Sequence, residues 1–317
     1  MPELPEVETM RRGVASIAGC TIRDCRKPRS RLQSIEMTPD FRSFRRRAIG
    51  RTIAVVGRVG KRIVLKLDSH DRIVIEPRMS GSVILADPRD RTHLRLILDL
   101  VPPPISPRRT AGKPLAASHT PPTDANLRER LLSAPPKQLL FWDQRGLGVV
   151  RLVTPAEFDS RYGADRVGPD ALRISAAELR KRLETSRRAV KVAMLDQKAL
   201  AGIGNIYASE TLHLAGIHPG SPCNKLTPRQ WTKLHAAMGK VLHEALRRQG
   251  STLADNVYTA PDGKPGKYAF RVYQRHGHPC PRCGQANIER IVQAQRSTFF
   301  CPACQIADAG WKGTISG

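Results

Sequence analysis

The sequence lacks any apolar run near the roughly 20 residues that a membrane-spanning helix needs, so we expect no transmembrane segment. Its first six residues, MPELPE, have neither the basic start nor the apolar stretch of a secretory signal. In a chain that is not exported, the seven cysteines are expected to be reduced thiols and not a disulfide framework. These absences predict a soluble protein of the cytoplasm.

Acidic residues are also scarce. The chain has 53 Lys and Arg against 28 Asp and Glu, which gives a formal net charge of +25. Self-repulsion on this scale destabilises a compact chain unless a polyanion binds it. DNA, RNA, a ribosome or an anionic membrane surface would each satisfy this requirement, so the charge by itself leaves the partner open.

A length of 317 residues is enough for two modest domains with separate cores. Residues 5–19 carry apolar side chains at spacings of three and four, which predicts one helix with a buried stripe. Period-two alternation in residues 63–67, 72–76 and 94–98 then predicts short antiparallel strands. Residues 139–142 have the composition of a late strand of the same sheet. The first half is therefore expected to be an antiparallel sandwich or barrel.

From about residue 171 the pattern becomes helical. Helices are predicted around residues 179–183 and 189–200, and a long one is expected from the N-cap Thr227 to Gly250. The proline-rich, basic stretch 101–124 has too little apolar surface to pack and is expected to be a disordered insertion. The fold class predicted is α+β, with an N-terminal helix and β-sandwich before a helical domain and a Cys-rich module.

Four cysteines form two CxxC pairs with seventeen residues between them, namely Cys280, Cys283, Cys301 and Cys304. The spacing is typical of a tetrahedral zinc site, with the intervening residues long enough for a β-hairpin. Disulfides or a redox pair would explain the cysteines less well in a reducing compartment. Because four thiolates leave no open coordination position, we expect one structural Zn²⁺ that folds the module and performs no chemistry.

Five segments, in order along the chain, resemble the bacterial formamidopyrimidine-DNA glycosylases: 1–9 (MPELPEVET), 78–82 (RMSGS), 202–210 (GIGNIYASE), 262–266 (DGKPG) and 293–301 (QAQRSTFFC). The resemblance covers nearly the whole chain. It implies a catalytic β-sandwich domain in 1–155, a helix–two-turn–helix domain in 170–260, a zinc finger in 270–305 and a tail in 306–317.

The resemblance also implies the catalytic residues. Pro2, exposed as the terminal residue by removal of Met1, would be the nucleophile. An α-amine has a pKa of roughly 7.7–8.0, so a useful neutral fraction exists near pH 7. Glu3 would protonate the sugar ring oxygen, Lys61 would contact the phosphate and assist elimination, and Arg296 would assist the second elimination.

DNA contacts follow from the same resemblance. Three residues are implied to fill the gap left by a flipped base, namely Met79, Arg145 and Leu147. Four are implied to contact the backbone, namely His93, Arg145, Lys191 and Asn205.

The helix expected after Gly202 would offer free N–H groups to a phosphate. The chain departs from the family in residues 143–148, where DQRGLG replaces Asp-Pro-Arg-Arg-Phe-Gly, and in 76–78, where Glu-Pro-Arg replaces His-Leu-Gly. We therefore expect an altered wedge and an unaltered catalytic centre.

The function predicted is excision of oxidised purines, 8-oxoguanine and formamidopyrimidines, from duplex DNA by a monomer at the nucleoid, with β,δ-elimination of the strand. One alternative is an oxidised-pyrimidine glycosylase resembling endonuclease VIII. Another is a non-catalytic damage sensor on the same scaffold. A zinc-ribbon RNA or ribosome factor would explain the charge and the cysteines but not the N-terminal motif.

Overall fold

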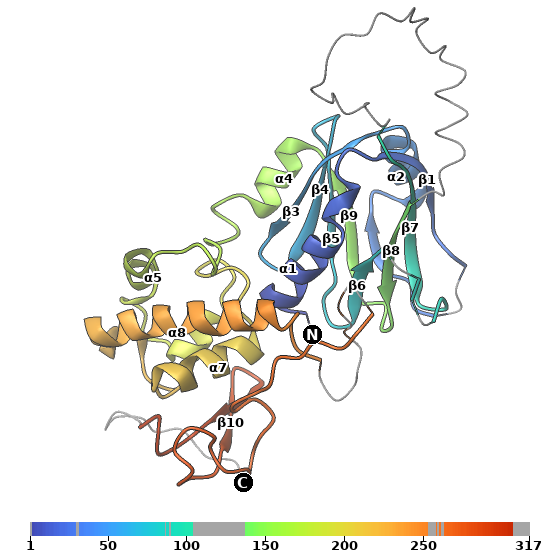
Figure 1. Cartoon of the computed structure of the whole chain (residues 1–317). Helices are drawn as coiled ribbons and strands as arrows, with labels where there is room; N and C mark the ends of the chain where they lie inside the picture. Colours follow the sequence, from blue (N-terminus) through green and yellow to red (C-terminus); the bar gives the residue numbers. More distant parts are fainter. Residues whose placement is uncertain are drawn as a thin grey trace, which may run out of the picture.

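The computed structural model describes residues 2–29, 32–85, 87–88, 90–103, 137–252, 258, 260 and 263–306. Figure 1 shows a β-sandwich on one side, a group of helices on the other, and a hairpin module beside the helices. Helix α1 (Leu4–Gly13) lies between the two halves. In the described part of the chain, no helix is both long and apolar enough to cross a membrane.

The N-terminal half is built from nine strands and three short helical elements in the described residues: the 3-10 turn η1 (Ala15–Ile17), β1 (Thr21–Arg26), β2 (Glu36–Thr38), α2 (Phe41–Ala48), β3 (Ile53–Val59), β4 (Arg62–Leu67), β5 (Arg72–Glu76), β6 (Gly81–Ile84), β7 (Leu94–Val101), β8 (Lys137–Asp143), β9 (Val149–Val153) and α4 (Pro155–Tyr162). The C-terminal half contains α5 (Ala176–Leu183), α6 (Val190–Met194), α7 (Asn205–Ala215), η2 (Cys223–Lys225), α8 (Pro228–Arg247), β10 (Glu289–Gln293) and β11 (Arg296–Phe300).

The strands form two sheets, one of order β1-β7-β8-β6 and one of order β2-β9-β5-β4-β3. The expected α+β fold with a β-sandwich is confirmed. Two details differ from the prediction. Residues 139–142 belong to β8, which pairs with β6 and β7 and not with β4 or β5. The β2–β9 pair is parallel, which is the exception to the antiparallel arrangement.

Helix α1 is shared by two hydrophobic cores. Val7 and Met10 pack into the core of the sandwich, whereas Leu4 packs into the core of the helical domain. The predicted helix to Gly19 is wrong in length, because α1 ends at Gly13 and Ile17 lies in η1. The spacing of buried apolar residues continues past the end of the helix, because the 3-10 turn keeps Ile17 buried.

The long helix α8 begins as expected, with Thr227 and Gln230 forming a capping box. It ends at Arg247, and Gly250 follows in the left-handed region at φ +81°. The predicted helix 189–200 is shorter, because α6 ends at Met194.

The predicted start of the insertion, residue 101, is one residue too early, because Val101 is the last residue of β7. Residues 104–124 lie outside the described residues, as does the tail from 307.

Candidate active site

The first residues are fixed at the junction of the two domains. The Leu4 amide donates to the Gly202 carbonyl at 3.1 Å, and the Glu3 amide donates to the Glu6 carboxylate at 2.9 Å. Pro2 is buried directly before them. A chain end held in this way is pre-positioned, so the reacting amine loses little freedom on meeting a substrate.

Glu3 is fully buried and caps α7. Its carboxylate accepts hydrogen bonds from the Ile206 amide at 2.9 Å and the Tyr207 amide at 3.3 Å. Gly204 is required there, since a Cβ at this position would lie 2.3 Å from the Glu3 carboxyl carbon. The start of α7 was expected to offer its N–H groups to a DNA phosphate; two of these groups are occupied by Glu3.

Burial raises the pKa of Glu3 above its ordinary value, and the charge of Lys61 and the two backbone N–H donors oppose this rise. Burial dominates because removing a carboxylate from water penalises its charged form. A carboxyl with a raised pKa retains a proton at higher pH than usual. It is therefore suited to act as a general acid.

Lys61 lies in the tight turn between β3 and β4, directly after Gly60, which adopts φ +55°. Burial lowers the pKa of Lys61, while the Glu3 carboxylate raises it and Arg296 and Arg62 lower it again. Glu3 and Arg296, which come from two distant segments, thus both act on the charge of Lys61. The amine is thereby closer to neutrality than a solvated lysine.

Lys191 does not lie on the surface, as a backbone-contacting role would suggest, but is fully buried. Its ammonium donates to Asn205 Oδ1 at 2.6 Å, Thr298 Oγ1 at 2.5 Å and the Ser297 carbonyl at 3.3 Å. Burial lowers the pKa of Lys191 to about 7.

Asn205 shares this network, since its amide donates to the same Ser297 carbonyl at 2.9 Å. Lys191 and Asn205 thus fasten α6 and α7 to β11, and the three hydrogen bonds of Lys191 leave its ammonium no free donor for DNA. The hairpin that they hold turns in two residues, with Ala294 at φ 45° and Gln295 at φ 60°. Arg296 follows at once and is exposed, and its charge lowers the pKa of Lys61.

The expected wedge residues lie on two loops that hydrogen bonds tie together. Met79 is 39% exposed, an unusual state for a large apolar side chain. Next to it, Ser80 donates to the buried carboxylate of Asp143 at 2.5 Å and accepts from the Arg145 amide at 3.0 Å. Arg145 is exposed and Leu147 is half-buried. Met79, Arg145 and Leu147 are therefore brought to one region.

His93 was expected to contact DNA, and Gly146 replaces an arginine of the family. His93 is only partly exposed, with its Nε2 3.3 Å from the Asp90 carboxylate and its ring edge-on to Trp142. Gly146, where the family has an Arg, adopts φ +65°, and a Cβ there would lie 2.4 Å from the Gln33 carbonyl oxygen. The backbone at Gln33 therefore excludes any side chain at position 146 in this conformation.

The four cysteines of the hairpin module form a metal site. Their Sγ atoms all lie within 4.8 Å of one another, with Cys280–Cys304 at 3.9 Å and Cys283–Cys301 at 3.7 Å. Zn–S bonds of roughly 2.3 Å in tetrahedral geometry require sulfur–sulfur distances close to these. The set fits one structural zinc ion, as expected from the sequence.

Zinc removal is expected to unfold the module, because its apolar core is small, with Val272, Ile288 and Phe299 as its main members beside the cysteines. Cys283→Ser should lower bound zinc from one ion per chain to below about 0.2, measured by elemental analysis of the purified protein. Cys25→Ser, in the sandwich core, should retain the full ion. A Cys283→Ser variant with undiminished zinc would contradict this assignment.

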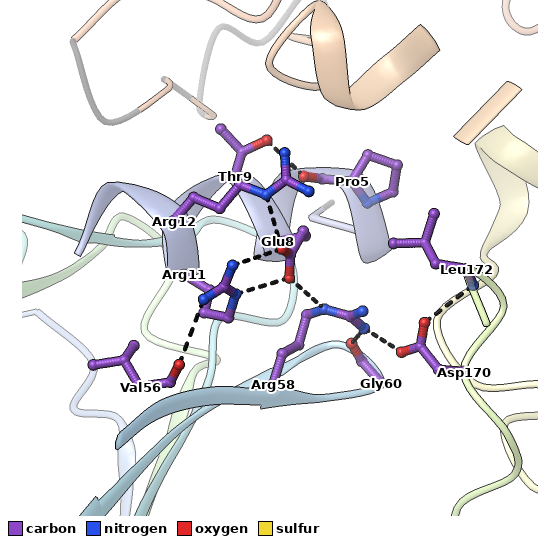
Figure 2. Close-up of polar contacts among 10 residues, drawn as sticks. All are labelled: Pro5, Glu8, Thr9, Arg11, Arg12, Val56, Arg58, Gly60, Asp170 and Leu172. Atoms are coloured by element: carbon purple, nitrogen blue, oxygen red, sulfur yellow. Dashed lines mark hydrogen bonds and ion pairs between the residues drawn. The ribbon is translucent and has the colours of Figure 1, made fainter. Parts of the chain in front are cut away.

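A buried ionic network behind α1 positions the Lys61 turn (Figure 2). The Arg58 side chain, 7% exposed, donates to Glu8 on α1 at 3.0 Å and to the Gly60 carbonyl at 2.9 Å, and pairs with Asp170 of the interdomain segment at 2.7 Å. One guanidinium thus connects the helix bearing the N-terminus, the turn bearing Lys61 and the start of the helical domain. No sequence pattern distinguishes Arg58 from the many surface cations of this basic chain.

Burial by itself would raise the pKa of Glu8, but hydrogen bonds from Arg11, Arg12 and Arg58 outweigh it and lower the pKa to about 2 from an ordinary 4.5. A carboxyl whose pKa is lower in the folded than in the unfolded state stabilises the fold at pH values above the unfolded-state pKa. That contribution is lost as the pH falls through the folded-state pKa. Glu8→Gln should therefore lower the free energy of unfolding by up to about 3 kcal/mol at pH 7.

The difference between parent and Glu8→Gln should shrink as pH falls from about 4.5 to about 2, measured by urea denaturation at several pH values. Glu178→Gln, on the exposed surface of α5, is the matched control and should show a small, nearly constant difference. A Glu8→Gln penalty that does not change with pH would refute the network as an ionic one.

Glu6 also has a role that the sequence did not reveal. It is buried and accepts hydrogen bonds from the Glu3 amide, the Tyr207 hydroxyl at 2.5 Å and the Ser251 amide at 2.8 Å. The spacing of Glu3 and Glu6 is that of a capping box, which was the available signal. Glu6 joins α1 to the segment after α8.

Comparison with known proteins agrees with this architecture. Residues 1–150 match the family model of the formamidopyrimidine-DNA glycosylase N-terminal domain, residues 167–257 match its H2TH domain, and residues 277–306 match a zinc finger found in FPG and IleRS. The chain is similar to the formamidopyrimidine-DNA glycosylase of Chloroflexus aurantiacus, with 38% identity over 96% of this chain and 98% of the relative. It is also similar to that of Bacillus subtilis, with 33% identity over 96% and 99%.

Solved structures of formamidopyrimidine-DNA glycosylases have the same fold. The MutM (FPG) protein from Thermus thermophilus superposes with a TM-score of 0.74 at 32% identity, covering 96% of this chain and 98% of that one. A Lactococcus lactis FPG variant in complex with Fapy-dG DNA superposes with a TM-score of 0.75 at 28% identity, covering 96% and 100%. From its β-sandwich through its H2TH helices to its zinc finger, this chain belongs to the formamidopyrimidine-DNA glycosylase family.

Proposed function

We propose that this protein is a base-excision-repair enzyme that removes oxidised purines from duplex DNA and then cleaves the strand at the abasic site. The observation that carries the proposal is a buried carboxyl with a raised pKa, Glu3, held next to the terminal Pro2 and electrostatically coupled to Lys61. Relatives bear the name formamidopyrimidine-DNA glycosylase. Lactococcus lactis Fpg has been crystallised with Fapy-dG DNA and with abasic-site DNA.

In the proposed first step, the Pro2 nitrogen attacks C1′ of the damaged nucleotide. The glycosidic bond breaks, the base leaves with its bonding pair, and the proton that the Pro2 nitrogen loses on bonding to C1′ goes to the departing base. Glu3 gives its proton to the sugar ring oxygen as the ring opens, which leaves a cationic iminium between Pro2 and C1′. Pro2 is suited to this step because a secondary amine forms an iminium that is cationic without further protonation.

The iminium acidifies the neighbouring C2′–H bond. Loss of that proton to a base and departure of the 3′ phosphate complete the first elimination, and a second elimination releases the 5′ phosphate. Lys61, whose pKa burial lowers, and Arg296, exposed at the start of β11, are the cations available to hold these phosphates. Met79, Arg145 and Leu147 would fill the space left by the flipped base.

The partner is duplex DNA, bound by one copy of the chain at the bacterial chromosome in the cytoplasm. A monomer is sufficient because Pro2, Glu3, Lys61 and Arg296 all come from one chain. His93, Lys191 and Asn205 would support the DNA backbone, Lys191 and Asn205 chiefly by holding β11 in place.

A substrate panel tests the proposal. Duplexes with 8-oxoguanine, a formamidopyrimidine or an oxidised pyrimidine, each opposite all four bases, are incubated with excess enzyme, and strand cleavage is followed on denaturing gels. Faster cleavage of the two purine lesions is expected. Faster cleavage of the pyrimidine lesion would favour the endonuclease VIII-like alternative. Tight lesion binding without any cleavage would identify a damage sensor and overturn the proposal.

A further inference from the structure

A basic groove lies on the outer face of the five-stranded sheet, and its lining residues do not include Pro2, Glu3, Lys61 or Arg296. Helix α4 lies beside this sheet (Figure 1). Its Phe158 and Tyr162 pack on Val64, Val74 and Val153. The groove runs between α4 and the ends of β4 and β5. Its arginines are Arg62, Arg78, Arg151, Arg161 and Arg166.

The acidic residues that line the groove are already engaged. Glu76 pairs with Arg62 at 2.9 Å, and Glu157 accepts from the Thr154 amide at 2.8 Å as part of the α4 capping box. Both carboxylates therefore have partners within the fold. The Arg62 guanidinium also lies over the Tyr162 ring, 5.2 Å from its centre. Two glutamates against five arginines leave the groove with a net positive charge.

Three of the arginines are available for a partner. Arg78, Arg161 and Arg166 are exposed, and in the described residues none of them forms an ion pair with a carboxylate. Cations gathered at one place repel one another unless an anion lies between them. The groove is open and has a volume of about 710 Å³, which suits a chain of phosphates better than a single small anion.

Two of the groove's arginines are direct chain neighbours of expected site residues. Arg62 follows Lys61 directly and lowers its pKa, and Arg78 precedes Met79. Arg78 holds φ +50°, a strained conformation for a non-glycine residue, and its side chain lines the groove although its backbone belongs to the wedge turn. At position 146, by contrast, the Gln33 backbone excludes an arginine side chain. Position 146 therefore adds no positive charge beside the wedge residues Met79, Arg145 and Leu147. The groove, by contrast, gathers several positive charges.

We infer that this groove binds the sugar-phosphate backbone of the duplex arm flanking the lesion, as a second DNA-contact surface outside the excision site. The inference rests on the proposed function, because the duplex must first be bound at the site. Its contacts are non-specific phosphate contacts, made by Arg78, Arg161 and Arg166. The groove should therefore increase affinity only for duplexes long enough to reach it.

The test uses the full-length protein and duplexes with a stable, uncleavable abasic analogue at the centre. Duplexes of about 12 and about 30 base pairs are compared at several salt concentrations, with the dissociation constant measured by fluorescence anisotropy. Arg161→Ala/Arg166→Ala is expected to weaken binding of the long duplex about ten-fold at low salt. The slope of log affinity against log salt should fall by about 2, since roughly one phosphate contact is lost per arginine.

Arg42→Ala/Arg46→Ala on α2 is the matched control, with the same charge change on exposed arginines that do not line the groove. On the long duplex the control should keep the parental slope, and on the short duplex both double variants should bind alike. Equal slopes for the two double variants on the long duplex would overturn the inference. Because binding is the readout, a parent that binds but never cleaves would refute the proposed function alone.

Discussion

Pro2→Gly is expected to lower the rate of base excision on the order of a thousand-fold or more and to remove the covalent adduct that borohydride traps between enzyme and lesion DNA. The variant lacks the secondary amine, so any imine it forms must take up a proton before it becomes strongly electrophilic. It also lacks the ring that limits the orientation of the terminal nitrogen beside Glu3. The adduct is measured by denaturing gel electrophoresis and the rate by single-turnover cleavage.

Pro5→Ala is the matched control for this substitution, since Pro5 lies in the first turn of α1 and has no free amine. Its adduct should match that of the parent, apart from a small loss of stability. Mass spectrometry of the intact chain supplies an independent check. If the mature protein still carries Met1, or a blocked terminus, and cleaves DNA at full rate, Pro2 is not the nucleophile.

Glu3→Gln is expected to slow excision of an oxidised purine by about 10²–10⁴-fold at neutral pH. The acid form is the active one, and burial raises the pKa of Glu3. The excision rate of the parent should therefore fall as pH rises through this raised pKa. In the variant, this decline of the rate with pH should be absent. Cleavage of a preformed abasic site should suffer less, because its aldehyde form is already ring-opened and needs no proton on the ring oxygen.

The fold should survive Glu3→Gln, because the amide oxygen of the substituted side chain still accepts from the Ile206 amide at the start of α7. Circular dichroism and the melting temperature check this point, with Glu178→Gln as an exposed control. Glu3→Ala should instead lose stability as well, since two buried N–H groups would lose their partner. A Glu3→Gln enzyme with the parental rate and pH profile would remove Glu3 from the mechanism.

Glu3 therefore has two tasks that one conformation satisfies. Its carboxyl caps α7 and so holds the helical domain against α1, and the same burial raises its pKa for proton transfer. Domain docking and acid strength are coupled in this arrangement. Substitutions that loosen the docking, including those in the Arg58 network, are expected to shift the pH dependence of excision toward lower pH.

Local patterns predicted much of the fold. Period-two alternation identified β4, β5 and β7, and the N-cap Thr227 marked the start of α8. The two CxxC pairs predicted the zinc site because ligand type and spacing suffice for such a site. Element ends were less accurate, as in α1 and α6, since a buried stripe continues through 3-10 turns that periodicity does not distinguish from a helix.

The site residues were predicted by family motif and not by pattern, and the structure changes how several of them act. Lys191 and Asn205 were expected to face DNA, yet their polar atoms bind each other and β11. The amides at the start of α7 were expected to bind phosphate, yet Glu3 occupies two of them. Each of these pairings joins residues more than ten positions apart, and a one-dimensional pattern does not contain such partners.

The sequence by itself determined the basic charge, the order of the two main folding units and the four zinc ligands, because each depends on composition or on short-range spacing. Only the tertiary structure decided which partners Glu3, Lys191 and Arg58 have, and where the arginines beside α4 gather. Burial, pKa and charge clustering are set by the side chains that folding brings together from distant parts of the chain, so they become defined only when the two halves pack around α1.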